Sequence, residues 1–460
     1  MRYAHLGTRS LCAMTRVNST DATPRLDRAE ADVLAARFVA GLHARGVGAG
    51  ERVAFSASNS PELLAAVFGC LRAGIAPIVL SSKLTAYERD SMLADVTPAL
   101  VVDDETCRSL TASELDALDT PALDARFHCR PLHFTSGTTG RPKAVWSGWH
   151  DETASEGVWQ DELGAWGFSA ADEHWVCSPL SHSAPLRFAV FTLLAGGAVR
   201  IPVDFDAAEV RKGLEGGVST TFMAPTQLQR VLDGGPVVAE RLRLLAHAGS
   251  ECPEQLKRSA IDAFGASVVV EFYGSTEGQF TVCPASEWLA RPGTVGRARP
   301  GRRMKVVDGQ LWCEPPDFAR FEYWGDPAKT AAVWDGSWFT VGDLGRIDHE
   351  GYVYLEGRRS DLIIITGGVN VYPAEVERIL RELDGVTDIC IVGLDDVQWG
   401  QRVCAVITGD VTTAQLEAYA KEHLAPYKRP KTIRRVDAMP LTHSGKIDRQ
   451  AVAASLAEDG

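Results

Sequence analysis

The sequence predicts an α/β fold: a large N-terminal domain of helix-covered, mainly parallel sheets with a small β-rich subdomain, followed by a small mobile α+β C-terminal domain. Three observations lead to this prediction. The 460 residues exceed the size of one ordinary domain. Helix signals alternate with continuous apolar strands, as in a parallel sheet covered on both faces. Near Pro292 the sequence changes to short β-rich segments with many Gly and Pro residues.

The N-terminal part alternates regularly between helical and strand patterns. In order, we expect a helix at 28–45, a strand at Val53–Ser56, a helix at Pro61–Arg72, a strand at Ala76–Leu80, a helix ending at Asp95 and a strand at Leu100–Asp103. The alternation continues beyond residue 131. Further apolar runs that predict buried strands are Trp175–Cys177, Thr220–Phe222, Leu244–Ala246 and Val268–Glu271.

The sequence pattern of the C-terminal part differs from that of the N-terminal part. The stretch from Pro292 to about Leu355 predicts a small antiparallel or barrel-like subdomain, and a compact mixed segment begins at Ser360. Its expected elements are a helix at Ala374–Arg381, a strand at Ile389–Val392 and a helix at Ala414–His423. We therefore predict a boundary at 357–361 that divides the chain into residues 1–357 and residues 358–460.

Composition and charge exclude some classes of function. The formal net charge is −13, which argues against a general nucleic-acid binder because such a protein needs a basic surface. Apolar runs such as Leu63–Leu71 are too short to span a membrane. The ten cysteines and the histidines are scattered without metal-ligand spacing, so reduced thiols and a cytoplasmic location are expected.

The start of the chain has two interpretations. Residues before Asp21 carry Arg and no acidic side chain, as a transit peptide does, but they lack a secretory core and cleavage pattern. A ragged or misassigned start is the interpretation that we favour.

The most informative stretch runs from Phe134 to Lys143, with the sequence FTSGTTGRPK. An apolar strand at Pro131–Phe134 leads into glycines and hydroxyl side chains and ends in a cation. Glycines allow backbone N–H groups to converge on an anion, and the hydroxyls add donors, so the stretch suits a triphosphate. A Walker A pattern is not satisfied, because Arg141 and Pro142 separate Gly140 from the lysine.

This decapeptide resembles the phosphate loop of the acyl-adenylate-forming superfamily, which contains acyl- and aryl-CoA ligases, peptide-synthetase adenylation domains and luciferases. The other motifs of that family follow in its order. The resemblance implies an AMP-binding domain at 1–357 and a mobile domain with a catalytic lysine at 358–460. It implies ATP contacts by Thr135, Ser136, Gly137, Thr138, Thr139, Gly140 and Lys143.

A second stretch, Tyr273–Gly278 (YGSTEG), follows a predicted strand. It resembles the family motif in which Tyr273 and Gly274 lie near adenine, Thr276 contacts phosphate and Glu277 helps to hold Mg²⁺. A carboxylate beside a triphosphate needs a bridging cation, and Mg²⁺ prefers oxygen ligands. The alternative is that Glu277 only caps a helix.

Two further motifs flank the predicted boundary. Asp343, after Val341-Gly342, resembles the ribose-binding aspartate of the family, and Arg358 resembles the arginine that contacts ribose or phosphate. The pivot usually carries Asp or Lys two residues after this arginine, and here it is Ser360. The resemblance also implies that Gly367 and Gly368 belong to a loop that moves in for the thiol half-reaction.

The stretch Leu441–Arg449 (LTHSGKIDR) resembles the C-terminal lysine motif. Lys446 would then neutralise the charge that grows on the α-phosphorus as the substrate carboxylate approaches. A solvated surface lysine is the alternative interpretation.

The acyl side of the site is predicted from two segments. His182, in Pro179–Pro185, resembles the histidine that borders the acyl tunnel, with a structural core histidine as the alternative. Gly249, Ser250 and Glu251 resemble the adenine-side loop of the family.

The resemblance implies an ATP-dependent acid–thiol ligase that forms an acyl adenylate and pyrophosphate and then a CoA thioester, with ATP, Mg²⁺ and coenzyme A as cofactors. Fatty, aromatic or polycyclic acids are the expected substrates. The stretch Ser183–Val190 offers no acidic partner for a substrate ammonium, which disfavours amino acids. An acyl-AMP ligase that loads an acyl carrier protein and a non-catalytic adenylate-binding relative are the alternatives.

Overall fold

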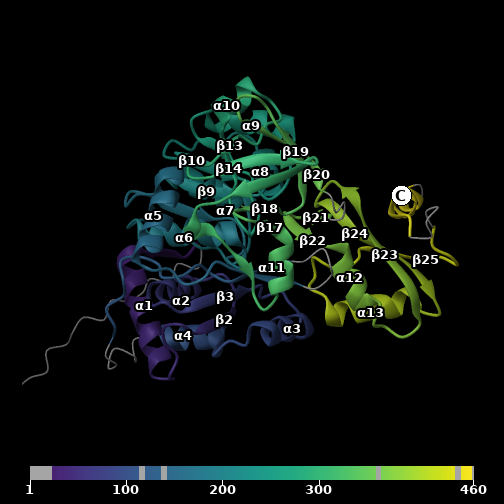
Figure 1. The fold of residues 1–460 in the computed structure, drawn as a ribbon, viewed down its shortest axis with the longest axis horizontal. Helices are drawn as coiled ribbons and strands as arrows, with labels where there is room; N and C mark the ends of the chain where they lie inside the picture. The colour runs from purple at the N-terminus through teal and green to yellow at the C-terminus, as the bar shows by residue number, and fades with distance from the viewer. Residues whose placement is uncertain (1–22, 113–119, 136–141, 359–363, 441–446, 458–460) are drawn as a thin grey trace, which may run out of the picture.

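The computed structural model describes residues 23–112, 120–135, 142–358, 364–440 and 447–457. The chain forms a large N-terminal α/β body and a small C-terminal domain that lies beside it (Figure 1). This arrangement confirms the predicted fold class. Among the described residues, no helix is long and apolar enough to cross a membrane.

The N-terminal elements form a small three-stranded parallel sheet with the strand order β3-β2-β4. Their bounds are β1 Arg25–Asp27, α1 Arg28–His43, β2 Arg52–Ser56, α2 Pro61–Arg72, β3 Ala76–Leu80, α3 Ala86–Val96, β4 Leu100–Asp103 and α4 Asp104–Thr111. The predicted elements of this region are all present, and α1 ends two residues earlier than expected. The short helix α4 was not predicted.

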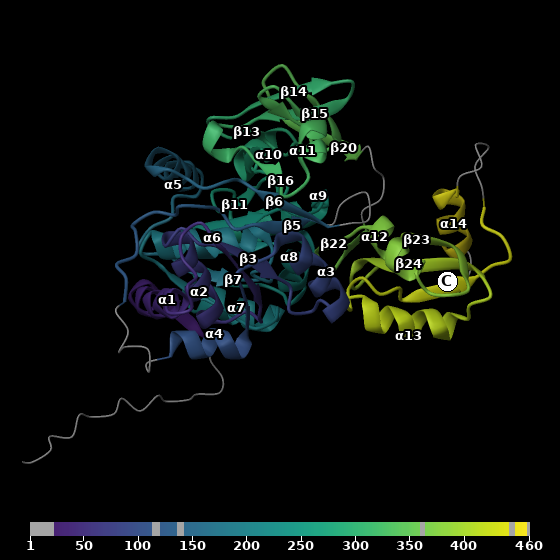
Figure 2. The same ribbon diagram turned by 60° about the horizontal axis from the view of Figure 1, so that its bottom comes forward.

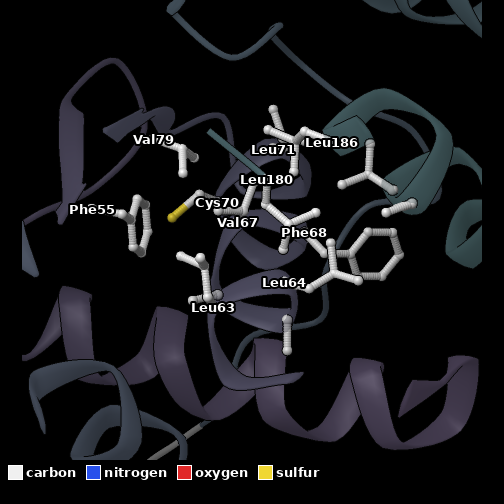
Figure 3. Close-up of a cluster of buried hydrophobic side chains, with 14 of the residues drawn as sticks. Phe55, Leu63, Leu64, Val67, Phe68, Cys70, Leu71, Val79, Leu180 and Leu186 are labelled. Atoms are coloured by element: carbon white, nitrogen blue, oxygen red, sulfur yellow. The ribbon is translucent and has the colours of Figure 1, made fainter. Parts of the chain in front are cut away.

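Helix α2 lies at the centre of the N-terminal core (Figure 3). Its Leu64 and Phe68 are completely buried, and so is Phe55 on the adjoining strand β2. Ser60 accepts a hydrogen bond from the backbone N–H of Leu63 and begins the helix directly before Pro61. Because α2 is apolar on nearly all sides, it packs between α1 and the sheet.

The larger sheet has eight strands in the order β1-β8-β7-β9-β10-β11-β12-β13. Its central strands β7 to β11 are parallel, and helices cover them (Figures 1 and 2). The elements of this region are α5 Glu152–Trp166, β7 Glu173–Val176, α6 Ser183–Leu194, β8 Ala198–Arg200, α7 Ala207–Glu215, β9 Thr220–Met223, α8 Pro225–Asp233, β10 Leu244–His247, α9 Glu254–Phe264, β11 Val269–Glu271, β12 Thr281–Pro284, α10 Ala285–Ala290 and β13 Arg297–Ala298.

A β-rich subdomain follows, as predicted for the region after Pro292, and its main sheet is antiparallel. Its elements are β14 Arg303–Val307, β15 Gln310–Glu314, β16 Glu322–Tyr323, α11 Pro327–Val333, β17 Trp334–Asp335, β18 Trp338–Phe339, β19 Asp343–Ile347 and β20 Val353–Arg358. Strand β16 instead joins a three-stranded sheet with β5 (His133–Thr135) and β6 (Lys143–Trp146). Because β16 pairs with β6, the β-rich subdomain lies next to the predicted phosphate-binding stretch, which begins in β5 and ends in β6.

The C-terminal domain is a five-stranded sheet with helices against it. Its elements are β21 Ile364–Thr366, β22 Val369–Val371, α12 Pro373–Leu380, β23 Val386–Asp396, β24 Gly400–Gly409, α13 Thr413–His423, β25 Thr432–Arg435 and α14 Arg449–Ala457. Helix α13 contacts α3 of the large domain, where the Thr85 hydroxyl donates to the His423 carbonyl at 3.1 Å. The two domains therefore enclose a space between them.

Candidate active site

A cavity of about 1380 Å³ lies where the large sheet, the β-rich subdomain and the C-terminal domain meet. Its wall contains most of the predicted site residues that the structure describes. They are Thr135, Lys143, His182, Gly249, Ser250, Glu251, Tyr273, Gly274, Thr276, Glu277, Asp343 and Gly368. Segments more than 230 residues apart in sequence, from Thr135 to Gly368, thus line one space.

Strands β5 and β6 fix the two ends of the predicted phosphate loop. They pair antiparallel, with Thr135 opposite Lys143. The predicted residues Ser136, Gly137, Thr138, Thr139 and Gly140 lie outside the described residues. Burial lowers the pKa of Lys143, and Lys329 adds repulsion, whereas the carboxylates of Glu277 and Asp326 act in the opposite direction.

Glu277 lies near Lys143 in the cavity wall. Its buried carboxylate accepts a hydrogen bond of 2.9 Å from the hydroxyl of Tyr323. The Nζ of Lys143 lies 4.7 Å from the centre of the Tyr323 ring, so one tyrosine orders both charged groups. Glu277 lies in the turn between the bridged residues Gly274 and Gln279, and no helix begins there. The helix-cap alternative is therefore wrong.

Tyr273 and Asp343 form the next part of the wall. The Tyr273 hydroxyl donates to a carboxylate oxygen of Asp343 at 2.6 Å, and both residues are buried. Asp343 begins β19 and pairs in backbone register with Arg358 at the end of β20. The two predicted nucleotide-binding residues thus occupy neighbouring strands.

His182 precedes the first turn of α6 and lines the cavity. It makes no side-chain capping bond, and its side chain is exposed to the cavity. The core-histidine alternative is therefore wrong. The surrounding protein desolvates the ring and lowers the pKa of His182, which favours a neutral imidazole at pH 7.

Gly367 and Gly368 form the turn between β21 and β22, with φ angles of +58° and +81°. A Cβ atom on Gly368 would lie 3.0 Å from the Cβ of Ala224 and 3.1 Å from the Oγ1 of Thr226. This turn of the C-terminal domain is therefore pressed against the loop between β9 and α8 of the large domain. Only glycine fits such a left-handed, closely approached position.

A buried ion triad joins the two domains beside the cavity. The Lys428 Nζ lies 2.8 Å from Glu88 Oε1 on α3 and 2.8 Å from Glu375 Oε1 on α12. Burial alone would lower the pKa of Lys428, but the carboxylates of Glu375 and Glu88 and the Tyr427 hydroxyl outweigh it and raise that pKa well above its usual value. The lysine is therefore charged in the folded protein.

Sequence reasoning did not assign Tyr323, Lys428 or Glu88 to the site. Tyr323 lies 46 residues after Glu277, and Lys428 lies 340 residues after Glu88, so no local pattern connects them. Glu375 lies seven residues after the predicted loop residue Gly368, and this closeness in sequence was the one available signal. The predicted catalytic residue Lys446 lies outside the described residues.

The chain belongs to the AMP-binding enzyme family. The sequence model of that family matches residues 13–317, and the model of the AMP-binding enzyme C-terminal domain matches residues 375–446. The predicted family is thereby confirmed.

Individual relatives agree with this assignment. The chain is 30% identical to a feruloyl-CoA synthase of Amycolatopsis sp, over 92% of each chain. It is 28% identical to a long-chain-fatty-acid–CoA ligase of Mycobacterium tuberculosis, over 93% of this chain and 92% of the relative. A solved structure of o-succinylbenzoate CoA synthetase from Bacillus subtilis superimposes with a TM-score of 0.81 at 25% identity, over 93% of this chain and 92% of that chain. These matches confirm the predicted enzyme class, an AMP-forming acid–thiol ligase.

Proposed function

We propose that the protein joins a carboxylic acid to coenzyme A in two steps, through an acyl adenylate. The main support for this proposal is that one cavity is lined by all the groups that the reaction needs. Tyr273 and Asp343 are the proposed nucleotide contacts, Lys143 and Glu277 the proposed phosphate and Mg²⁺ contacts, and Gly368 belongs to the C-terminal turn. A nucleotide, an acid and a thiol all need access to one reacting centre, and this arrangement supplies it.

In the first step, an oxygen of the substrate carboxylate attacks the α-phosphorus of ATP. The new O–P bond forms as the bond to the β-phosphate breaks, and pyrophosphate leaves. Thr135, Lys143 and Thr276 line the cavity, which supports a role for them in meeting the negative charge of the phosphates. We assign to Lys446 the role of neutralising the negative charge that grows on the α-phosphorus.

In the second step, the sulfur of the thiol attacks the acyl carbon, and AMP leaves with the anhydride oxygen. The Gly367–Gly368 turn supports a route for the thiol, because Gly368, Val369 and Asn370 line the cavity next to the loop after β9. The solved relative that superimposes well was bound to an analogue of its CoA product. That likeness supports the view that the domains lie here in the thioester-forming arrangement.

Glu277 fits the proposed role as a Mg²⁺ ligand. Its carboxylate is a hard oxygen donor in the cavity wall, held in place by Tyr323 and close to the cation of Lys143. Within the described residues, no group of three or more His, Cys, Asp and Glu side chains could hold a metal without help. Glu277 would therefore hold Mg²⁺ together with substrate phosphates, as is usual for this ion, which would neutralise phosphate charge.

The acyl group is proposed to be aliphatic, aromatic or polycyclic, as the named relatives act on fatty and aromatic acids. Coenzyme A is the proposed acceptor and the cytoplasm the proposed location. An acyl carrier protein is the competing acceptor.

The proposal is tested by measuring AMP and pyrophosphate release from Mg-ATP over a panel of carboxylic acids, with and without CoA, and the thioester by mass. We expect acid-dependent release that CoA stimulates, together with a thioester product. Acid-dependent pyrophosphate release without CoA stimulation would favour a carrier-protein substrate. ATP binding without turnover of any acid would favour a non-catalytic protein.

A further inference from the structure

A small recess adjoins the main cavity. Ser183, Arg187 and Thr276 line both spaces, and Ser183 directly follows His182 in sequence, so the recess lies next to the side of the cavity on which the acid would lie. Its volume is about 40 Å³. Since a water needs roughly 10–15 Å³ of such space, the recess holds a group of about three heavy atoms.

The recess is lined by both cationic and apolar side chains. Arg130, His133 and Arg187 supply polar nitrogen atoms. The apolar side chains, all buried, are Leu71, Phe127, Val158, Val190 and Phe191. A lining of this kind suits a small anionic group on an apolar stem better than it suits a fully charged triphosphate.

The charges around the recess do not balance. Four arginines surround two buried carboxylates: Arg130, Arg187, Arg299 and Arg302 surround Asp161 and Glu162. Arg302 binds both oxygens of Asp161, at 2.8 and 2.9 Å. Glu162 lies 3.6 Å from Arg187 and 3.7 Å from Arg299. Both carboxylates are therefore already shared, and positive charge is in excess.

Two groups of the lining lack partners. Arg130 makes no hydrogen bond or ion pair with any residue that the structure describes. The Nδ1 atom of His133, a residue that is only 7% exposed, is buried without a hydrogen-bond partner. Burial lowers the pKa of Arg130 to about 10, so the guanidinium is still charged at pH 7. The Arg130 guanidinium is half-buried and unpaired, and an anion from the substrate would pair with it.

We propose that this recess binds a second carboxylate of the acyl substrate, so that the enzyme prefers acids with two carboxylates. Arg130 and Arg187 would pair with the distal carboxylate, beside the neutral ring of His133. The other carboxylate would remain beside His182 for adenylation. This inference rests on the proposed function and narrows the acid to a short aliphatic or aromatic dicarboxylic acid.

The test compares acids in matched pairs, in which a methyl group replaces the distal carboxylate, such as adipic with hexanoic acid and isophthalic with 3-methylbenzoic acid. Pyrophosphate release gives kcat/KM, and calorimetry with a non-hydrolysable ATP analogue gives affinity. We expect the dicarboxylic member of at least one pair to be preferred by at least ~10-fold in both measurements, since only that member can form charge-assisted hydrogen bonds with the arginines.

Arg130→Gln is the principal variant, because Arg130 has no described partner whose loss would unfold the protein. We expect it to abolish the preference without lowering the thermal midpoint, and Arg187→Gln to act in the same direction. Arg126→Gln is the matched control. Arg126 pairs with Glu156 outside the recess, so this variant should keep the preference.

Equal use and equal binding of the paired acids would overturn the inference, and so would a preference that survives both Arg130→Gln and Arg187→Gln. Weaker binding of ATP or pyrophosphate in these variants, to the same extent with either acid, would assign the recess to phosphate instead. If no acid releases pyrophosphate but dicarboxylic acids bind in an Arg130-dependent way, the recess assignment stands and the proposed ligase activity fails.

Discussion

At the scale of single residues, Glu277 and Tyr323 act as a pair. The 2.9 Å hydrogen bond from the Tyr323 hydroxyl fixes the carboxylate that we assign to Mg²⁺. Tyr323→Phe should weaken Mg²⁺ affinity by about 10- to 100-fold, the usual cost of losing a group that orients a metal ligand. Glu277→Gln, which removes the charge, should weaken it further. The measurement is the Mg²⁺ dependence of acid-dependent pyrophosphate release.

The control for this pair is Tyr354→Phe, since Tyr354 lies in the same subdomain and its hydroxyl donates to Asp348 at 3.4 Å. This variant should titrate with Mg²⁺ as the unmodified protein does. An unchanged titration in Glu277→Gln would remove Glu277 from the metal site.

Buried histidines predict how stability depends on pH. Burial lowers the pKa values of His133, His174 and His247 to about 3. In the unfolded chain these groups titrate near pH 6.5, so the unfolded state takes up protons first as the pH falls. Each histidine therefore contributes stability that is present above about pH 6.5 and lost toward pH 3, at about 1.4 kcal/mol per pH unit.

The sign of this effect can be checked with His174→Gln. The His174 Nδ1 lies 3.0 Å from the Thr220 hydroxyl, and the ring is completely buried. Denaturant unfolding between pH 7.5 and pH 5 should show stability falling with acid, and less steeply in this variant. An identical slope in the two proteins would show that His174 does not titrate on unfolding.

At the scale of elements, we expect the β21–β22 hairpin to be needed for thioester formation but not for adenylate formation. Gly368→Ala adds a Cβ at 3.0 Å from Ala224 to a backbone with φ +81°. The hairpin should then dock poorly, so thioester formation should fall at least ~10-fold while pyrophosphate release changes little. Rapid-quench measurement of each step gives the two rates.

Gly351→Ala is a matched control for the backbone strain alone. Gly351 has φ +86°, and nothing lies within 4 Å of its added Cβ. In both variants an alanine in the left-handed conformation destabilises the folded protein by about 1–2 kcal/mol. Equal effects of the two substitutions on thioester formation would show that the contact with Ala224 has no role.

Elements with a strong local pattern could be predicted, and those without one could not. The buried strand β3 and the capped helix α2 are visible as an apolar run and as Ser60-Pro61. Helix α4 has only eight residues, with Cys107, Leu110 and Thr111 buried, and it is shorter than the stretch of sequence over which a helical period can be recognised. The proposed site residues inside motifs could be named for the same reason. Tyr323 and Lys428 could not, because each acquires its role from contacts that form only on folding, and Arg130 could not, because the recess that it lines forms only on folding.

At the scale of the whole molecule, the Glu88–Lys428–Glu375 triad holds the C-terminal domain against α3. Lys428→Met would leave two buried carboxylates without their cation, which costs about 3–5 kcal/mol. That penalty should reduce the docked arrangement by at least ~100-fold. Small-angle scattering should show a more open molecule, and thioester formation should fall more than pyrophosphate release.

Lys421→Met provides the control on the same domain. Its ion pair with Glu417 is exposed, at 63% and 57% of the side chains, so its loss should cost less than about 1 kcal/mol. If Lys428→Met scatters like the unmodified protein and catalyses both steps normally, the triad does not set the domain arrangement.

We propose that the acid is activated as an adenylate in the cavity that Lys143, Glu277 and Asp343 line. The most direct measurement uses an accepted acid whose carboxylate carries ¹⁸O, with the products analysed by mass. Activation as an adenylate transfers one ¹⁸O atom to AMP, alongside an unlabelled pyrophosphate and a CoA thioester. Label in inorganic phosphate, with ADP as the other product, would show that the acid is activated as an acyl phosphate instead.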